Sequence, residues 1–272
     1  TGGWAEASFK DATQYCQCHN PGAKIHQAAT SKDKGHNYIP ADDAIAYSAS
    51  PAYVHMTTNN TLYGTQWHRV PKVPAGVPIV ADASSDIFSY PIDVTKYGVI
   101  YGGAQKNMGT TGATFIIIRD DLIEKANKDI PRMCQYGVFA KEESRPNTPP
   151  HFAIYTVGLM AKWIKSQGGL AALKKANEEK AGLIYAALDE CSGFWAGHAR
   201  KEDRSMMNIT FRAKGGEALD EAFLKLAKEN GCDGLKGHRS TGGMRASTYN
   251  AFPREGCKVL ADLIRDFAKK NG

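Results

Sequence analysis

The chain has 272 residues, of which 42% are hydrophobic and 23% charged, with a net charge of +6. This length is enough to bury a sizeable core in one large domain, or in a large and a small one. No apolar run approaches the roughly 18 residues of a membrane span, and no secretory signal is visible. The basic residues are scattered and not interleaved with aromatic ones, so we expect small anionic ligands and neither nucleic acid nor membrane as partners.

The six cysteines do not form the even framework of a small secreted scaffold. We therefore expect reduced thiols and a cytoplasmic location. The segment "CQCH", Cys16 to His19, offers possible zinc ligands, but no second matching cluster exists in the sequence. The end of a helix running into a loop is the favoured interpretation, and no metal is expected.

The first half of the chain predicts a helix followed by short strands. The opening "TGGWAEASFKDATQYC" lacks an initiating methionine and enters a helical pattern at once, as a fragment or processed chain does. Apolar runs bounded by turn residues follow at 23–29, 52–56, 77–84, 97–104 and 113–119. Several are nearly continuous in Val, Ile and Ala, which is typical of strands covered on both faces in a parallel or mixed sheet.

The second half predicts longer helices with two strands between them. Helical patterns begin at Asp120 and run over 151–167, with an interruption at Gly168 and Gly169, then over 170–190, 217–230 and from about Pro253. Strand-like segments lie at 205–212 and 242–248. The predicted fold is α/β, with a large domain over residues 1–165 that has a mostly parallel sheet, and a small C-terminal α+β domain over 166–272.

Two polar residues stand at the ends of neighbouring predicted strands. Asp82 ends "VPIVAD", and Lys106 follows "YGVIYGGA". If both strands are parallel, these residues share the edge where open α/β sheets bind ligands. A partly desolvated lysine can form a Schiff base, and pyridoxal phosphate needs such a lysine and a carboxylate beside its ring nitrogen. Read alone, Lys106 is more simply a solvated turn residue, and Asp82 a cap of the next helix or turn.

Three long segments in order carry a resemblance to a known family. They are "PIDVTKYGVIYGGAQKNMGTTGATFIIIRDDLI", "RPNTPPHFAIYTVGLMAKWIKSQGG" and "LKGHRSTGGMRASTYNAFPREG". The chain resembles the phosphoserine aminotransferases, which are fold-type I enzymes dependent on pyridoxal phosphate, over nearly its whole length. The resemblance implies a homodimer with shared active sites.

The resemblance also implies a set of residues that bind the cofactor. Lys106 would hold it covalently, and Asp82 would pair with its pyridinium nitrogen. Trp4 would stack on the ring, Thr61 would approach the phenolic oxygen, and Gln105 would contact the phosphate. Asn147 and Thr148 would reach the cofactor phosphate of the neighbouring subunit. Taken alone, Trp4 is a core aromatic, Thr61 a turn hydroxyl, and "NTPP" a rigid loop.

Three residues of "GHRSTGGMR" are implied in substrate binding. Arg245 would hold the α-carboxylate, and His238 and Arg239 would meet the phosphate of phosphoserine. The planar guanidinium suits both anions. Taken alone, His238 and Arg239 are surface residues.

The implied reaction is transamination between O-phospho-L-serine and 2-oxoglutarate, giving 3-phosphooxypyruvate and L-glutamate, in serine biosynthesis. The family's chain extends before Trp4 with a glycine-containing phosphate-binding stretch and an arginine that reaches the partner's substrate, and neither stands in this sequence. Two alternatives stay open: another fold-type I reaction, such as a desulfurase or lyase, and a catalytically silent fragment.

Overall fold

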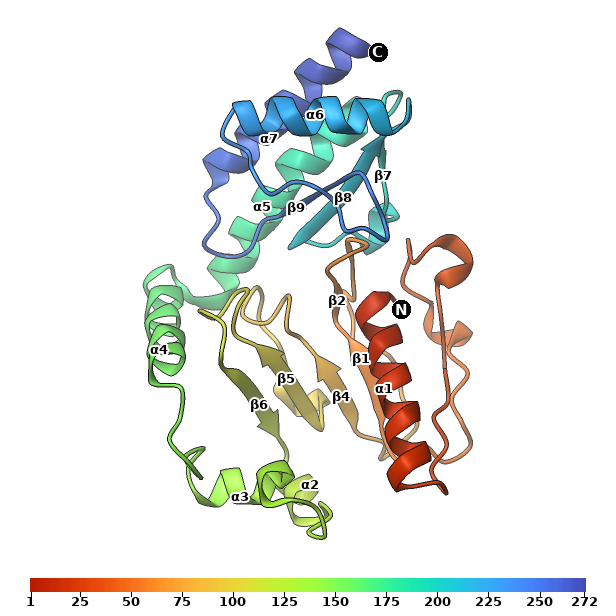
Figure 1. The fold of residues 1–272 in the computed structure, drawn as a ribbon, viewed down its shortest axis with the longest axis vertical. Coiled ribbons are helices and arrows are strands. Elements are labelled where there is room, and N and C mark those ends of the chain that lie inside the picture. Colours follow the sequence, from red (N-terminus) through yellow and green to blue (C-terminus); the bar gives the residue numbers. More distant parts are fainter.

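The computed structural model describes residues 1–272 and contains two sheets of three or more strands (Figure 1). The larger sheet has the order β1-β4-β5-β6, built from β1 Val54–Thr57, β4 Ile79–Asp82, β5 Val99–Gly103 and β6 Thr114–Ile118. The pairs β1·β4 and β4·β5 are parallel, and β6 pairs antiparallel with β5. The predicted mostly parallel α/β sheet is confirmed.

The centre of this sheet is apolar because its strands are rich in Val, Ile and Ala. Ile79, Ala81 and Ile100 are almost fully buried and belong to a cluster of 11 buried residues. Two expectations are wrong. Residues 23–29 form no strand, because this segment pairs with no sheet. Strand β6 is not covered on both faces: Ile116 and Ile117 are 40% and 41% exposed, since β6 is the edge strand of the sheet.

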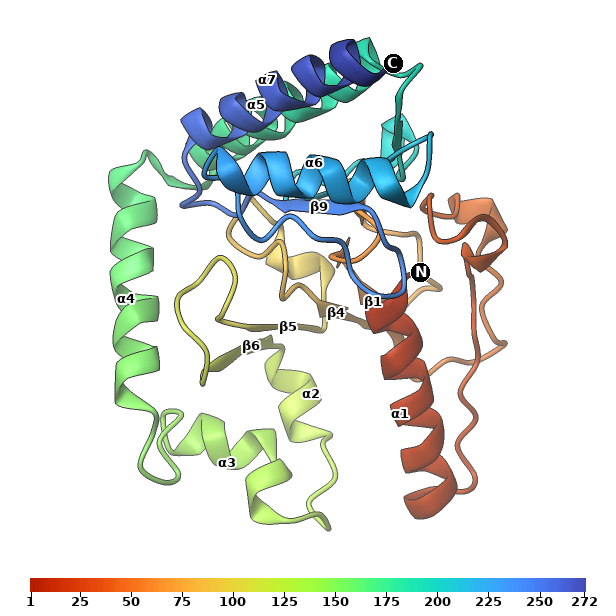
Figure 2. The same cartoon turned by 45° about the horizontal axis from the view of Figure 1, so that its top comes forward.

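Four helices surround the larger sheet. These are α1 Gly3–His19, α2 Asp120–Glu124, α3 Tyr136–Lys141 and α4 His151–Ser166. Helix α1 ends at His19, so "CQCH" is a helix terminus as favoured. Both views show α1 and α4 on opposite sides of the sheet (Figure 2). Helix α4 buries only Ala153 and Ile164 of its 16 residues.

Shorter elements connect these parts. A two-stranded antiparallel hairpin is formed by β2 Asn59–Asn60 and β3 Thr65–Gln66. Single 3-10 turns lie at Lys32–Lys34, Asp42–Ala44, Val94–Lys96, Arg132–Cys134 and Lys201–Asp203. The hairpin projects from the larger sheet toward the second one, so it connects the two cores.

The second sheet is antiparallel, with the order β7-β8-β9, built from β7 Trp195–Gly197, β8 Asn208–Ala213 and β9 Met244–Ser247. Helices α5 Gly169–Glu190, α6 Glu217–Glu229 and α7 Arg254–Asn271 pack with it around 19 buried residues. Trp195 lies at the centre, 1% exposed, and donates its indole N–H to the carbonyl of Ile264 at 3.0 Å. The predicted C-terminal α+β architecture is thus present.

The break between α4 and α5 falls where the sequence predicts it. Gly168 and Gly169 both adopt positive φ, at 91° and 81°, which side chains disfavour. No helix of the chain is long and apolar enough to cross a membrane. No cluster of three or more His, Cys, Asp or Glu side chains is arranged to hold a metal ion.

Candidate active site at the carboxyl edge of the parallel strands

Asp82 and Lys106 lie at the same edge of the larger sheet. Asp82 is the last residue of β4 and stands in register with Tyr101 of the parallel strand β5. After β5 ends at Gly103, the chain enters a turn that carries Lys106. The parallel arrangement on which the Asp82–Lys106 prediction depends is therefore present.

Lys106 stands in a half-buried, polar environment. Its Nζ donates a hydrogen bond to Thr61 Oγ1 at 3.3 Å. Burial lowers the pKa of Lys106, the charge of Asp82 opposes this shift, Arg245 lowers the pKa further, and Asp86 raises it. A lowered pKa increases the share of neutral amine, which is the form that attacks a carbonyl carbon.

Thr61 is held in place by the β2–β3 hairpin, which packs against β8. Asn59 donates from Nδ2 to Asn208 Oδ1 at 2.9 Å, and Thr210 Oγ1 donates to the carbonyl of Leu62 at 3.1 Å. Gly64 turns the hairpin with a φ of 70°, and a Cβ there would lie 2.9 Å from the carbonyl oxygen of Asn208. The hydroxyl that meets Lys106 is thus positioned by the second sheet as well as by the first.

The Asp82 carboxylate is oriented by its neighbour in the following turn. Its Oδ1 accepts hydrogen bonds from the N–H of Ser84 at 3.0 Å and from Ser84 Oγ at 2.6 Å. On the adjacent strands, His55 Nε2 and the Tyr101 hydroxyl lie 2.9 Å apart. Burial lowers the pKa of His55, and the charge of Asp82 opposes this. These contacts hold the carboxylate at the strand end with a fixed direction.

A second carboxylate, Asp86, lies fully buried one turn beyond Asp82. It accepts hydrogen bonds from Thr58 Oγ1, from Gln66 Nε2 at 3.1 Å and from the Tyr90 hydroxyl at 3.2 Å. Burial raises the pKa of Asp86 to about 6, although these three donors work in the opposite direction. Asp86 therefore links the hairpin to the turn that follows β4.

The predicted substrate-binding residues lie on β9 and on the loop before it. Arg245 of β9 is half-buried, and its charge acts on Lys106. In the loop, His238 Nδ1 and Ser240 Oγ are 2.7 Å apart, and Arg239 is exposed. Among these three residues, Arg245 is the one that the structure brings to Lys106.

Four predicted cofactor-binding residues form no hydrogen bond to Lys106 or Asp82. Trp4 lies in the first turn of α1 and is 50% exposed. Gln105 is exposed beside Lys106. Asn147 and Thr148 are exposed in the loop before α4, where Asn147 Nδ2 contacts only the carbonyl of Thr148 at 3.5 Å. Their roles remain predictions.

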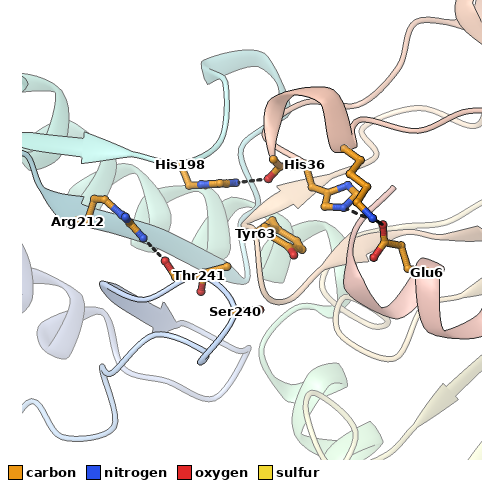
Figure 3. A pocket seen from close by; sticks show the side chains of 9 residues that line it. Glu6, His36, Tyr63, His198, Arg212, Ser240 and Thr241 are labelled. Carbon is orange, nitrogen blue, oxygen red and sulfur yellow. Dashed lines mark hydrogen bonds and ion pairs between the residues drawn. The ribbon is translucent and has the colours of Figure 1, made fainter. Parts of the chain in front are cut away.

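A cavity of about 600 Å³ lies between the start of α1, the β2–β3 hairpin and the loop before β9 (Figure 3). Tyr63 stands between His36 and His198, with ring centroids 4.8 and 5.5 Å away. The other lining residues are Glu6, Lys32, Gly35, Arg212, Ser240 and Thr241. None of the ten predicted site residues lines this cavity, although Tyr63 and Ser240 follow Thr61 and His238 by two residues each.

The fold and the site together define a class of enzyme. A half-buried lysine amine that faces a carboxylate at the carboxyl edge of a parallel sheet is suited to amine–carbonyl chemistry. The family model of the class-V aminotransferases matches residues 12–260. The chain therefore belongs to the class-V aminotransferases.

Relatives and solved structures bear this out. Phosphoserine aminotransferase of Lysinibacillus sphaericus is 51% identical over all of this chain and 72% of its own length. The crystal structure of phosphoserine aminotransferase from Bacillus circulans subsp. alkalophilus has a TM-score of 0.94 at 41% identity and covers all of this chain and 73% of that one. The crystal structure of PLP-bound phosphoserine aminotransferase from Trichomonas vaginalis has a TM-score of 0.91 at 33% sequence identity, and the match covers 97% of this chain and 73% of that one. The family and the fold expected from the sequence are confirmed.

Several residues at the site escaped the sequence analysis. His55, Ser84 and Asp86 belong to it through hydrogen bonds or charge, and none stands in a recognisable spacing with Lys106. Ser84 had a signal, because a serine two residues after an aspartate at a strand end often donates to that carboxylate. Asp86 had none, because two of its three donors, Thr58 and Gln66, come from the distant hairpin segment.

Proposed function

We propose that this chain catalyses transamination between O-phospho-L-serine and 2-oxoglutarate, giving 3-phosphooxypyruvate and L-glutamate, with pyridoxal phosphate as cofactor. The family supports this reaction, because relatives that are 51% and 47% identical over all of this chain are phosphoserine aminotransferases. The observation that carries the proposal is the position of the Lys106 amine, which donates a hydrogen bond to Thr61 and is near enough to Asp82 and Arg245 for both charges to act on its pKa.

The residues at the strand ends fit pyridoxal phosphate. Lys106 offers an amine of lowered pKa for the aldehyde, and Asp82 offers a carboxylate oriented by Ser84 for the ring nitrogen. Gly102 has no side chain, and a Cβ there would approach Ser84 and Phe115 to 3.4 Å or less. When bound, the cofactor supplies an electron sink that acidifies the Cα proton of an amino acid.

Lys106 and Asp82 would divide the proton chemistry between them. The Lys106 Nζ would take the Cα proton of the amino acid and later return a proton, as general base and general acid. Partial burial favours the first of these roles because it stabilises the neutral amine. The Asp82 carboxylate would hold the ring nitrogen of the cofactor in its protonated form.

Arginine and histidine side chains bind the two anionic groups of the substrate. In this proposal Arg245 binds the α-carboxylate, which is supported by the action of its charge on Lys106. His238 and Arg239, on the loop that leads into β9, bind the phosphate, and the exposure of Arg239 supports this because its guanidinium is accessible to a ligand. The planar fork of arginine binds either anion through two parallel hydrogen bonds.

A homodimer is part of the proposal. The first turns of α4 expose Phe152 by 72% and Tyr155 by 63%, directly after Asn147 and Thr148. Exposed aromatic side chains of this size favour contact with another chain. Such a contact would bring the loop of Asn147 and Thr148 to the partner's cofactor phosphate. We also infer a reducing compartment, the cytoplasm, from the six free cysteines.

Replacement of Lys106 tests the proposal. Wild-type chain titrated with pyridoxal phosphate should gain visible absorbance and release glutamate from phosphoserine and 2-oxoglutarate, and Lys106→Ala should do neither, because it has no amine for the aldehyde. Lys96→Ala, at an exposed lysine of the same region, is the matched control and should behave like wild type.

The same assay separates the alternatives. Sulfide release from cysteine in place of glutamate release would identify a desulfurase, although no cysteine stands in the segments that carry Asp82 and Lys106. Absence of any spectral change in the wild-type chain would identify a catalytically silent fragment. Full transamination by Lys106→Ala would refute the role of Lys106.

A further inference from the structure

A buried lysine outside the candidate site has an unusual set of partners. Lys180, in the middle of α5, is 3% exposed. Its Nζ lies within hydrogen-bond distance, 2.8 to 3.2 Å, of four main-chain carbonyl oxygens in the segment between β9 and α7, so its three N–H groups are shared among those of Thr248, Tyr249, Asn250 and Phe252. No carboxylate forms an ion pair with it. The segment 248–252 is thus wrapped around an ammonium group as carbonyl ligands are wrapped around a cation.

Burial of this ammonium is costly unless the carbonyls are held in place. An unpaired charge in a protein interior loses its hydration, and here four carbonyl dipoles replace the water. Burial lowers the pKa of Lys180 to about 8, so the side chain is mostly protonated at neutral pH. The carbonyls otherwise belong to irregular backbone with no strand partner, so the ammonium also satisfies them.

Asn250, within this segment, connects it to the turn of Lys106. Its backbone N–H donates to Asn107 Oδ1 at 3.0 Å, and its Nδ2 donates to the carbonyl of Phe88 at 2.8 Å. Its Oδ1 accepts from Asn177 Nδ2 at 2.8 Å, one helical turn before Lys180. Asn107 is the residue next to Lys106, so the hydrogen bonds run from α5 through 248–252 to the turn of the reactive amine.

We infer that Lys180 is a positioning residue for transamination: by holding segment 248–252 it fixes Asn250 against Asn107, and so sets the Lys106 amine relative to Arg245 on β9. This inference rests on the proposed function of Lys106. The segment follows β9 directly, so the hydrogen bonds of Lys180 to this segment determine both where the substrate carboxylate binds and where the amine stands. A displacement of about 1 Å between such groups can cost about 100-fold in rate.

Lys180→Met tests the inference, because methionine keeps the length of the side chain and removes the charge and all donors. Lys175→Met, at an exposed lysine of the same helix, is the matched control. In cofactor-free chain, the amide of Met108, bonded to the carbonyl of Ala104, and that of Asn250 should exchange with deuterium at least tenfold faster in Lys180→Met only. With pyridoxal phosphate bound, the pH midpoint of its visible absorbance should shift, and kcat/KM for phosphoserine should fall about 10- to 100-fold.

A double-mutant cycle shows whether Lys180 acts through Asn107. Asn107→Ala removes the acceptor of the Asn250 N–H and leaves the four carbonyl groups around Lys180 in place. The effects of Lys180→Met and Asn107→Ala on kcat/KM should therefore combine to clearly less than their product. Unchanged exchange at Met108 and Asn250 in folded Lys180→Met, or independent effects in the cycle, overturns the inference. If Lys180→Met does not fold, Lys180→Gln, with one amide donor, takes its place in both experiments. Exchange is measured without cofactor or substrate. It therefore tests the positioning role of Lys180 even if the wild-type chain proves not to catalyse the proposed reaction.

Discussion

The buried carboxyl group of Asp86 makes the stability of the protein depend on pH in a direction that can be calculated. Burial raises its pKa from 3.8 to about 6. Between these two values the folded chain holds a proton that the unfolded chain has lost, so the contribution of Asp86 is fully present below about pH 4 and is lost as the pH rises through 6. Since one pH unit in a pKa corresponds to about 1.4 kcal/mol, the loss is about 3 kcal/mol.

Asp86→Asn removes this titration while keeping the shape of the side chain. Urea unfolding of both cofactor-free proteins, followed by tryptophan fluorescence and circular dichroism between pH 4 and pH 8, gives the free energy of unfolding at each pH. The stability of wild type relative to Asp86→Asn should fall by about 2.4 kcal/mol between pH 4 and pH 7, because the unfolded carboxyl group is already more than half ionised at pH 4. Trp67 lies in the buried cluster of the larger sheet and reports on the same region.

A control of opposite sign is available in Asp93, which is exposed and accepts hydrogen bonds from Thr95 that lower its pKa. The stability of wild type relative to Asp93→Asn should therefore rise with pH over the acid range. A relative stability of wild type and Asp86→Asn that is constant, or that rises with pH, would refute the reasoning on Asp86.

Three further predictions concern single substitutions, one of them with a matched control. Trp195→Ala should lower the free energy of unfolding by about 3–5 kcal/mol in urea unfolding, since the indole fills the centre of the second core and loses its hydrogen bond; a loss under 1 kcal/mol would contradict this. Gly64→Ala should lower the free energy of unfolding by about 1–3 kcal/mol, because Gly64 has a positive φ and lies close to β8. Gly182→Ala, the control in open space on α5, should raise it by up to about 1 kcal/mol. Ser84→Ala should weaken the binding of pyridoxal phosphate up to about tenfold in a spectral titration, because Asp82 loses one of two donors; unchanged affinity would count against the role of Asp82.

The local pattern of the sequence predicts most of the architecture. Runs of Val, Ile and Ala specify β4 and β5, and helical periodicity specifies α5, α6 and α7, because burial of apolar side chains at a fixed period depends on neighbours in sequence. The meeting of Asp82 and Lys106 follows from the parallel pairing of two consecutive strands. The three long segments also determined the family without a structure.

The edges of the sheets were decided by tertiary structure. Residues 23–29 have the composition of a strand but no strand to pair with, and β6 exposes Ile116 and Ile117, which point to opposite faces, because the chain covers neither face of this edge strand fully. Composition reports how apolar a segment is, and pairing depends on which other segment lies beside it.

The polar interior was decided in the same way. Lys180 reads in the sequence like the other lysines of α5, and only the return of the chain after β9 wraps four carbonyl groups around its ammonium. Asp86 obtains two of its three donors from the segment of the β2–β3 hairpin, 20 and 28 residues away. The sequence by itself determined β4, β5, the helices α5, α6 and α7, and the place of the Lys106 amine just after a strand, because these depend on local pattern. The tertiary structure decided what surrounds that amine, because hydrogen bonds between distant segments exist only once the chain has folded.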